Sequence, residues 1–185
     1  MDLVRPDAEH LPSYVAALRR GWSPSTESDI SAEVLAEIEA DAEDFLAGTD
    51  DRHPIGRTVT LPDGSLVPRL PGFARWMWDG EFAGSINLRW QDGTTDLPPH
   101  CLGHIGYSVV PWKRRLGYAT EALRGMLPLA REVGPWLSFV EITTDPDNVG
   151  SQRVIEANGG VLVERFDKGP AYGSAEGLRY RVPLS

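Results

Sequence analysis

Residues 114–119 of the chain read Arg114-Arg115-Leu116-Gly117-Tyr118-Ala119, between an apolar run and a segment with helical periodicity. Backbone N–H groups at the start of a helix have no partner within the helix and carry partial positive charge. Gly117 lets the backbone come close to a ligand, and the small Ala119 keeps the next position uncrowded. Arg114 and Arg115 add fixed positive charge. The stretch therefore predicts a strand–loop–helix unit that holds a pyrophosphate.

Two common phosphate-binding motifs do not fit this loop. A nucleotide-hydrolase loop needs G-x-x-x-x-G-K followed by Ser or Thr, and the dinucleotide-binding fingerprint needs G-x-G-x-x-G. Neither pattern is present here. The arrangement Arg114-x-x-Gly117-x-Ala119 instead resembles the acyl-CoA loop of the GNAT family of N-acetyltransferases.

A second stretch strengthens this resemblance. It reads Asp145-Pro146-Asp147-Asn148-Val149-Gly150-Ser151-Gln152-Arg153-Val154-Ile155-Glu156-Ala157-Asn158-Gly159-Gly160. An Asn after a strand, a short helix and a Gly-containing turn resemble the second signature of the same family. The resemblance covers roughly residues 70–167 and is weak for residues 1–70.

The resemblance implies a single mixed α/β (α+β) domain over residues 1–185. Its central sheet would be mixed and mostly antiparallel, with helices on both faces. Residues 1–70 would form a variable acceptor-side region, and residues 71–167 the acetyl-CoA-binding core. The implied activity is transfer of an acetyl group from acetyl-CoA to a primary amine of a small molecule or peptide. The contrasting hypothesis is a non-enzymatic CoA-binding or interaction module of the same fold.

The resemblance also assigns the residues that would bind acetyl-CoA. The loop from Arg114 to Thr120 would hold the pyrophosphate. The strand before it would offer free backbone groups of Ser108, Val109 and Val110 to the pantetheine arm, and an N–H near Val109 or Val110 would polarise the thioester carbonyl. Asn148 and Ser151 are each either helix N-cap residues or contacts to the cofactor.

The proton-transfer groups are less well defined. Aminolysis of a thioester needs a neutral amine, so a side chain or water must accept its proton. His104, with an ordinary pKa of about 6.5, and Glu141 are the candidate bases, although a lone strand His is more often structural. Many family members carry a Tyr where this chain has Ile155, so the group that protonates the departing thiolate is unassigned.

Composition limits the class of protein. The 185 residues are 41% hydrophobic and 24% charged, as expected for one globular domain. No apolar run reaches the length of a membrane span, and no secretory signal is recognisable. The single Cys101 excludes an internal disulfide and favours a cytoplasmic location. A net charge of −9 argues against nonspecific binding to nucleic acid or anionic membranes, and no metal-ligand cluster is evident. A homodimer is one option that the sequence leaves open.

Residues 27–51 are acidic and contain no Lys or Arg. The usual explanation is a solvated helix face. A cationic acceptor, such as a polyamine, an aminoglycoside or a peptide amine, is the alternative. The carboxylates are Glu27, Asp29, Glu33, Glu37, Glu39, Asp41, Glu43, Asp44, Asp50 and Asp51.

Hydrophobic periodicity and turn residues predict the elements. Helices are expected at residues 10–20, 31–47, 120–133 and 151–158, and strands at 73–78, 81–90, 102–110, 136–143, 161–166 and 178–182. Pro128 should kink or shorten the third helix. Trp76, Trp78 and Trp90 are expected in the core, with one of them able to line the acceptor pocket.

Overall fold

The structure is a computed structural model that describes residues 1–26 and 28–184. The helices are α1 (Leu11–Arg19), α2 (Ser31–Ala40), α3 (Ala42–Gly48), α4 (Tyr118–Arg131) and α5 (Val149–Glu156), with 3₁₀ turns η1 (Pro111–Lys113) and η2 (Pro170–Tyr172). The strands are β1 (Asp2–Val4), β2 (Asp50–Asp51), β3 (Thr58–Thr60), β4 (Leu66–Pro68), β5 (Gly72–Trp78), β6 (Phe82–Arg89), β7 (Ile105–Val109), β8 (Phe139–Thr144), β9 (Val161–Asp167) and β10 (Glu176–Pro183).

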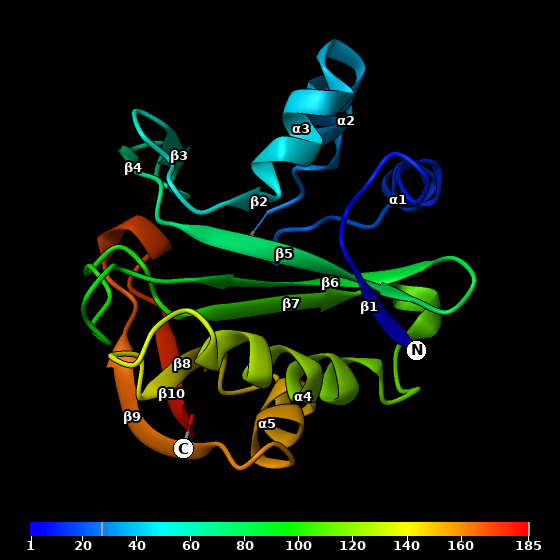
Figure 1. The fold of residues 1–185 in the computed structure, drawn as a ribbon. Helices are drawn as coiled ribbons and strands as arrows, with labels where there is room; N and C mark the ends of the chain where they lie inside the picture. Colours follow the sequence, from blue (N-terminus) through cyan, green and yellow to red (C-terminus); the bar gives the residue numbers. More distant parts are fainter. Residues whose placement is uncertain (27, 185) are drawn as a thin grey trace.

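The first sheet has the strand order β1-β5-β6-β7, with β2 also paired to β5. All of its pairings are antiparallel. The β5–β6 hairpin turns at Asp79-Gly80, as the sequence predicts, and Gly80 has the left-handed φ of 104° that such turns favour. This hairpin forms the centre of the molecule (Figure 1).

The second sheet has the order β8-β10-β9 and is also antiparallel. The two sheets meet where β7 and β8 begin: the backbone N–H of His104 donates to the backbone O of Glu141 at 2.8 Å. Beyond that point β7 and β8 are not paired. The helices α1–α3 lie on one side of the first sheet, and α4 and α5 on the other (Figure 1). The predicted mixed, mostly antiparallel fold with helices on both faces is confirmed.

Each face of the first sheet has its own hydrophobic cluster. Side chains alternate along a strand, so Trp76 packs under α1 and α2 while its neighbour Met77 packs toward α4. The α1 side also buries Tyr14, whose ring stacks on Trp76 at 4.6 Å between centroids, and Trp22. The α4 side continues across both sheets and fixes how they sit relative to each other.

The expected single helix over residues 31–47 is wrong, because the chain forms α2 and α3 instead. Asp41 separates them with an extended backbone (φ −158°, ψ 95°), and its side chain accepts a hydrogen bond from the N–H of Asp44 at 2.9 Å. Asp is a favoured N-cap residue and a poor residue for a helix interior, so it starts a new helix here. Gly48 does end the helical region.

Pro128 does not end α4, which continues to Arg131. Pro128 lies on the exposed side of the helix. It leaves the carbonyl of Arg124 without its helical N–H partner, but Arg124 is also exposed, so water can hydrogen-bond there. The short strands β1 to β4 were not predicted, because each is only two or three residues long and too short to show a periodic pattern.

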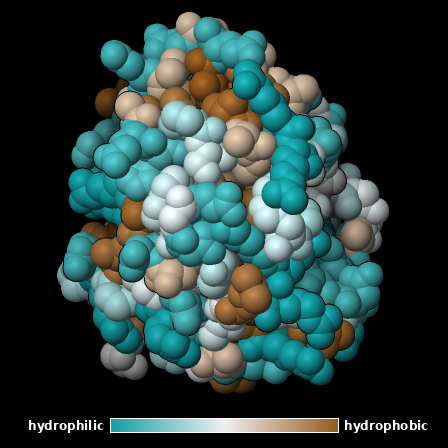
Figure 2. Space-filling view, turned by 90° about the vertical axis from the view of Figure 1, so that its right-hand side faces the viewer, coloured by the Kyte–Doolittle hydropathy of each residue, from teal (hydrophilic) through white to brown (hydrophobic). Residues whose placement is uncertain are grey.

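Within residues 1–26 and 28–184, no helix combines the length and apolar character needed to cross a membrane. Figure 2 shows the side of the molecule that carries α1 and the β5–β6 turn, and hydrophilic residues predominate on it. Hydrophobic residues appear there in separate groups.

Candidate functional site

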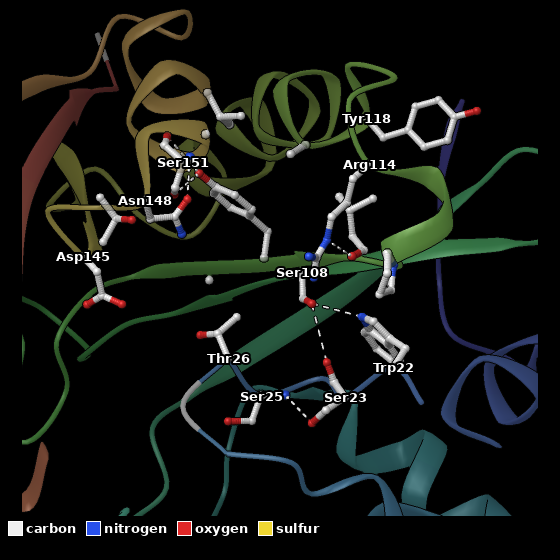
Figure 3. Close-up of a pocket in the computed structure, with 18 of the residues that line it drawn as sticks. Trp22, Ser23, Ser25, Thr26, Ser108, Arg114, Tyr118, Asp145, Asn148 and Ser151 are labelled. Carbon is white, nitrogen blue, oxygen red and sulfur yellow. Dashed lines mark hydrogen bonds between the residues drawn. The ribbon is translucent and has the colours of Figure 1, made fainter. Parts of the chain in front are cut away.

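A cavity of about 900 Å³ opens where β7 and β8 separate. Its walls come from the segment after α1, from β7, from the start of α4, from the end of β8 and from the start of α5. Figure 3 shows these walls facing one another across the cavity. Segments more than 100 residues apart in sequence therefore contribute to one site.

The backbone of β7 offers hydrogen-bonding groups to this cavity. The N–H of Val110 donates to Ala83 at 3.0 Å, and the carbonyl of His104 accepts from Arg89 at 2.9 Å. Because ladder bonds of an antiparallel pair alternate, even-numbered residues of β7 bond to β6. The N–H groups of Tyr107 and Val109 therefore point toward β8, and no described residue accepts from them.

The start of α4 presents a second set of free donors. Glu121 is the first residue of this helix whose N–H bonds back, to the carbonyl of Gly117 at 3.1 Å. The N–H groups of residues 115–120 have no partner among the described residues. Arg115 (φ 67°) and Gly117 (φ 84°) both adopt left-handed backbone conformations, which turn these N–H groups along the mouth of the cavity. The arrangement is suited to an anion.

Hydroxyl groups and an amide line the wall formed by α5. The side chain of Asn148 caps α5 by accepting from the N–H of Ser151 at 3.0 Å, and its NH₂ group faces the cavity (Figure 3). The hydroxyl oxygens of Tyr107 and Ser151 lie 2.7 Å apart. Burial raises the pKa of Tyr107 to about 12, so its hydroxyl keeps its proton at neutral pH. Asn148 is thus the N-cap of α5, whereas Ser151 lies in the first turn of the helix, and both residues line the cavity.

The opposite wall is a loop after α1 that was not singled out from the sequence. The indole N–H of Trp22 donates to the hydroxyl of Ser108 at 3.0 Å. The hydroxyl of Ser23 accepts from the N–H groups of Ser25 (3.3 Å) and Ile30 (3.2 Å), which holds the loop in shape. Small hydroxyl residues following Gly21 are the only signal for this loop in the sequence.

An ion pair between a buried lysine and an exposed aspartate lines the cavity. Lys168 is only 8% exposed, and its Nζ lies 2.5 Å from Oδ1 of Asp145. Both residues line the cavity, beside Thr143 and Thr144 at the end of β8. None of these four residues was predicted, because their proximity depends on the packing of β8 against the segment after β9.

Most of the predicted acetyl-CoA-binding residues lie together at this cavity, and two do not. Val110 is fully buried in the α1-side cluster, and Leu116 is 60% exposed on the outer side of its loop. The others all line the cavity: Ser108, Val109, Arg114, Arg115, Gly117, Tyr118, Ala119, Thr120, Asn148 and Ser151.

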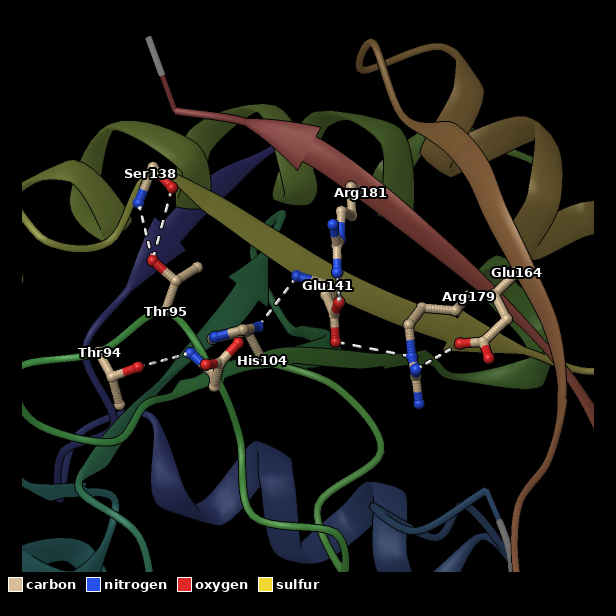
Figure 4. Close-up of polar contacts among 9 residues, drawn as sticks. Thr94, Thr95, His104, Ser138, Glu141, Glu164, Arg179 and Arg181 are labelled. Carbon is tan, nitrogen blue, oxygen red and sulfur yellow. Dashed lines mark hydrogen bonds and ion pairs between the residues drawn. The ribbon is translucent and has the colours of Figure 1, made fainter.

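The two candidate bases lie outside the cavity lining. His104 is fully buried, its Nδ1 accepts from the N–H of Glu141 at 2.9 Å, and burial lowers its pKa to about 4. The carboxylate of Glu141 accepts from Arg181 at 3.0 Å and lies 3.6 Å from Nε of Arg179 (Figure 4). The prediction that either residue accepts the proton of the amine therefore has no support from its position.

Two other predictions concern the acceptor side. Trp76 and Trp90 are buried, Trp78 packs against the α1-side cluster, and none of the three lines the cavity, where Trp22 is found instead.

Glu27 lies outside the described residues. Of the other acidic residues in the 27–51 stretch, Asp29 lines the cavity. Several are paired with arginines: Glu39 with Arg19, Asp44 and Asp51 with Arg57, and Asp50 with Arg52 and Arg75.

Comparison with known proteins identifies solved structures of similar fold and a matching family model. One similar solved structure is MccE, a microcin C7 self immunity acetyltransferase in complex with acetyl-CoA and AMP; it is 13% identical over 98% of this chain and 91% of that chain, with a TM-score of 0.62. A second is RimL, a ribosomal L7/L12 alpha-N-protein acetyltransferase in complex with coenzyme A, which is 14% identical over 98% of this chain and 92% of that chain, with a TM-score of 0.61. A third is a GNAT-family acetyltransferase from Streptococcus pneumoniae, which is 11% identical over 100% of this chain and 99% of that chain, with a TM-score of 0.63. At these identities the likeness concerns the fold. No curated protein matches the chain in sequence. The family model described as an acetyltransferase (GNAT) domain matches residues 3–161, and the chain therefore belongs to the GNAT family of acetyltransferases.

Proposed function

We propose that this protein transfers an acetyl group from acetyl-CoA to a primary amine of a small molecule or a peptide. The observation that carries the proposal is the row of unpaired N–H groups at residues 115–120, at the mouth of a cavity that runs between two separating strands. These are the features that a ligand with a pyrophosphate and a long amide-bearing arm requires. MccE and RimL, which bind acetyl-CoA and coenzyme A, have the same fold.

In the proposed complex, the pyrophosphate accepts hydrogen bonds from the N–H groups of residues 115–120. Arg114 and Arg115 add positive charge, although Nε of Arg114 also donates to the carbonyl of Val109 at 3.3 Å. Leu116 would contribute only its backbone, because its side chain points outward. Gly117 provides the left-handed turn from which α4 starts.

The pantetheine arm would lie between β7 and β8 and pair with the free N–H groups of Tyr107 and Val109. The NH₂ group of Asn148 could then donate to a pantetheine carbonyl. The N–H of Val109 would polarise the thioester carbonyl, since the N–H of Val110 is already bonded to Ala83. Ser108 would serve the acceptor side of the cavity, where its hydroxyl accepts from Trp22.

In the reaction, the amine nitrogen attacks the thioester carbon, and the C–S bond breaks as the new C–N bond forms. The departing thiolate needs a proton, and the hydroxyl pair of Tyr107 and Ser151 is positioned in the cavity to supply it. Ile155 is fully buried in the core and has no proton to donate. The amine loses its proton to water at the open acceptor side, near the exposed Thr26 and Asp29.

The acceptor would approach from the cavity wall formed by Trp22, Ser23, Ser25, Thr26, Ser28 and Asp29, which lies opposite the wall formed by α5 (Figure 3). We propose a cationic amine, because Asp29 lines this side and exposed Glu33 and Glu37 lie on α2 just beyond it. We also propose that the enzyme works in the cytoplasm, where its single Cys101 stays reduced.

A turnover screen tests the proposal. The protein is incubated with acetyl-CoA and a panel of polyamines, aminoglycosides, amino acids and peptides, and the released CoA thiol and the acetylated product are both measured. Amine-dependent thiol release with a product heavier by one acetyl group is the expected result. Tight binding of acetyl-CoA without turnover on any amine would favour a CoA-binding module, and absence of acetyl-CoA binding would exclude both functions.

A further inference from the structure

Asp79 connects the two ends of the pyrophosphate loop, although it lies in a distant turn. Its Oδ1 accepts a hydrogen bond from Nζ of Lys113, and its Oδ2 accepts one from the hydroxyl of Tyr118 at 2.6 Å. Lys113 ends η1, immediately before the non-helical part of this loop (residues 114–117), and Tyr118 begins α4, immediately after that part. One carboxylate therefore spans residues 114–117.

The position of Asp79 is fixed by the central hairpin. Its N–H donates to the carbonyl of Glu81 at 3.3 Å across the β5–β6 turn, and both strands belong to the core of the first sheet. The side chain is 21% exposed, and the hydrogen bond from Lys113 lowers the pKa of Asp79, so the carboxylate is ionised at neutral pH. The hairpin thus presents a charged group to the loop at a defined place.

Asp79 itself does not line the cavity, whereas Lys113 and Tyr118 do. The ring of Tyr118 points away from the cavity centre (Figure 3), toward the turn that carries Asp79. Its hydroxyl is therefore used for anchoring the first turn of α4 and not for contacting a ligand between β7 and β8. Lys113 is held from the same turn by Asp79 and also by Glu81, at 2.8 Å.

Besides the two bonds to Asp79, a bond from Nε of Arg114 to the carbonyl of Val109 holds the loop. The N–H groups of residues 115–120 make no hydrogen bonds within the described structure, and Arg115 and Gly117 adopt left-handed conformations. A loop of this kind loses conformational freedom when it closes on a phosphate, and that loss weakens binding. A clamp at both ends reduces the loss, because the loop is already ordered before the ligand arrives.

From these contacts we infer that Asp79 is a positioning residue that preorganises the pyrophosphate loop and thereby tightens acetyl-CoA binding without touching acetyl-CoA. The inference rests on the proposed function. The inference predicts that removing the charge of Asp79 weakens acetyl-CoA binding, which is the opposite of the effect expected from charge repulsion alone. Removing a negative charge near a phosphate site would by itself strengthen binding of an anion, whereas loss of the clamp weakens it.

The test compares two ligands that differ in the part held by the loop. The parent protein and Asp79→Asn are titrated with acetyl-CoA by calorimetry, and with S-acetylpantetheine, which lacks the pyrophosphate, by ligand-observed NMR. We expect Asp79→Asn to raise the Kd for acetyl-CoA about tenfold. The Kd for S-acetylpantetheine should stay within about twofold of the parent value.

Two further variants sharpen the result. Tyr118→Phe removes one of the two bonds and should raise the Kd for acetyl-CoA by less than Asp79→Asn does. It also keeps the test decisive if Asp79→Asn fails to fold. Glu81→Gln removes a contact to Lys113 but leaves the bridge intact, so it should bind acetyl-CoA as the parent does.

Unchanged or tighter binding of acetyl-CoA by Asp79→Asn would overturn the inference, and so would an equal loss for both ligands, which indicates general damage to the fold. If the parent protein does not bind acetyl-CoA at all, the proposed function itself fails. The two failures are therefore distinguishable.

Discussion

The imidazole of His104 takes the place of a backbone carbonyl: its Nδ1 accepts a hydrogen bond from the N–H of Glu141 at 2.9 Å. The N–H of His104 donates in turn to the carbonyl of Glu141 at 2.8 Å, so the two residues join β7 to β8 just before the strands separate (Figure 4). A proton on Nδ1 would abolish the first of these bonds. The neutral ring is therefore the form that holds the two sheets together at the base of the cavity.

The stability of the fold should depend on pH through His104. Burial lowers the pKa of His104 to about 4, below the ordinary value of 6.5. Between these values the unfolded chain binds a proton that the folded chain does not, so the free energy of unfolding should fall as the pH decreases from about 6.5 to about 4, by roughly 3 kcal/mol in full. Denaturant unfolding at a series of pH values measures this. His104→Asn keeps a hydrogen-bond acceptor but does not titrate, so subtracting its curve removes the contributions of the other groups. Parallel curves for the two proteins would contradict the prediction.

His104→Asn also separates a structural role from a catalytic one. An Asn side-chain oxygen can accept from the N–H of Glu141 but cannot act as a base. We therefore expect acetyl transfer to continue at a rate within about threefold of the parent, whereas loss of a general base would reduce it by roughly 10²-fold or more. His104→Leu, which removes the acceptor, should be less stable than His104→Asn. A 10²-fold lower rate in a well-folded His104→Asn protein, with an altered pH profile, would restore His104 as the base.

The cofactor loop could be predicted because its signals are local. A strand, a Gly with a left-handed backbone and a helix start follow each other within residues 105–120, and each can be recognised from neighbouring residue types. The second signature was found in the same way, and Asn148 indeed caps its helix. The mixed fold followed from the order of periodic segments and from the resemblance that these two motifs carry.

The remaining features depend on contacts between distant segments. Tyr107 and Ser151 are 44 positions apart, and Asp79 is 34 positions from Lys113, so neither pairing is visible in the sequence. Its ordinary pKa of about 6.5 made His104, in the predicted strand 102–110, a candidate base. Its actual surroundings depend on where β8 crosses β7. The break between α2 and α3 is an exception, because the capping bond of Asp41 that causes the break is local. The break was missed because the hydrophobic periodicity continues through Asp41.

Gly117→Val should weaken acetyl-CoA binding at least tenfold, or about 1.4 kcal/mol. Gly117 lines the cavity and has φ 84°, so a β-branched side chain strains the backbone of the loop that presents the N–H groups to the proposed pyrophosphate site. Calorimetric titration gives the affinity. Gly64→Val is the matched control, since Gly64 has φ 83° and equally open surroundings in the β3–β4 turn. Equal affinities for a folded Gly117→Val and the parent would remove the loop from the binding site.

Tyr107→Phe should lower the rate of acetyl transfer by roughly 10²-fold, with a much smaller effect on acetyl-CoA affinity. The substitution keeps the ring and removes the hydroxyl that pairs with Ser151 and that we propose as the proton donor to the departing thiolate. Ser151→Ala should have an effect in the same direction. Single-turnover rates and calorimetric Kd values separate the two quantities. Tyr180→Phe serves as the control, because its hydroxyl bonds to Glu156 at 3.4 Å and does not line the cavity. Parent-like rates in Tyr107→Phe would show that the thiolate is protonated by another group.

Reversing Glu33 and Glu37 to Lys should raise KM for a cationic acceptor without changing the Kd for acetyl-CoA. Both residues are exposed on α2, beyond the cavity-lining Asp29, and neither is among the carboxylates that pair with Arg19, Arg52, Arg57 or Arg75. Their potential would attract amines at low salt and fade as ionic strength rises, because the screening length is about 10 Å at 0.1 M.

Steady-state kinetics at low and high salt measure this effect, once the turnover screen has supplied an acceptor. Glu9 and Glu132 are exposed and do not line the cavity, so reversing them to Lys changes the net charge by the same amount at other sites. Local steering predicts a salt-dependent rise in KM for the α2 variant alone, because only its charges lie on the segment that follows the cavity-lining Asp29. Equal KM values for the parent and both variants would instead identify the acidic stretch as a solvated helix face. An equal rise in both variants would reflect net charge alone.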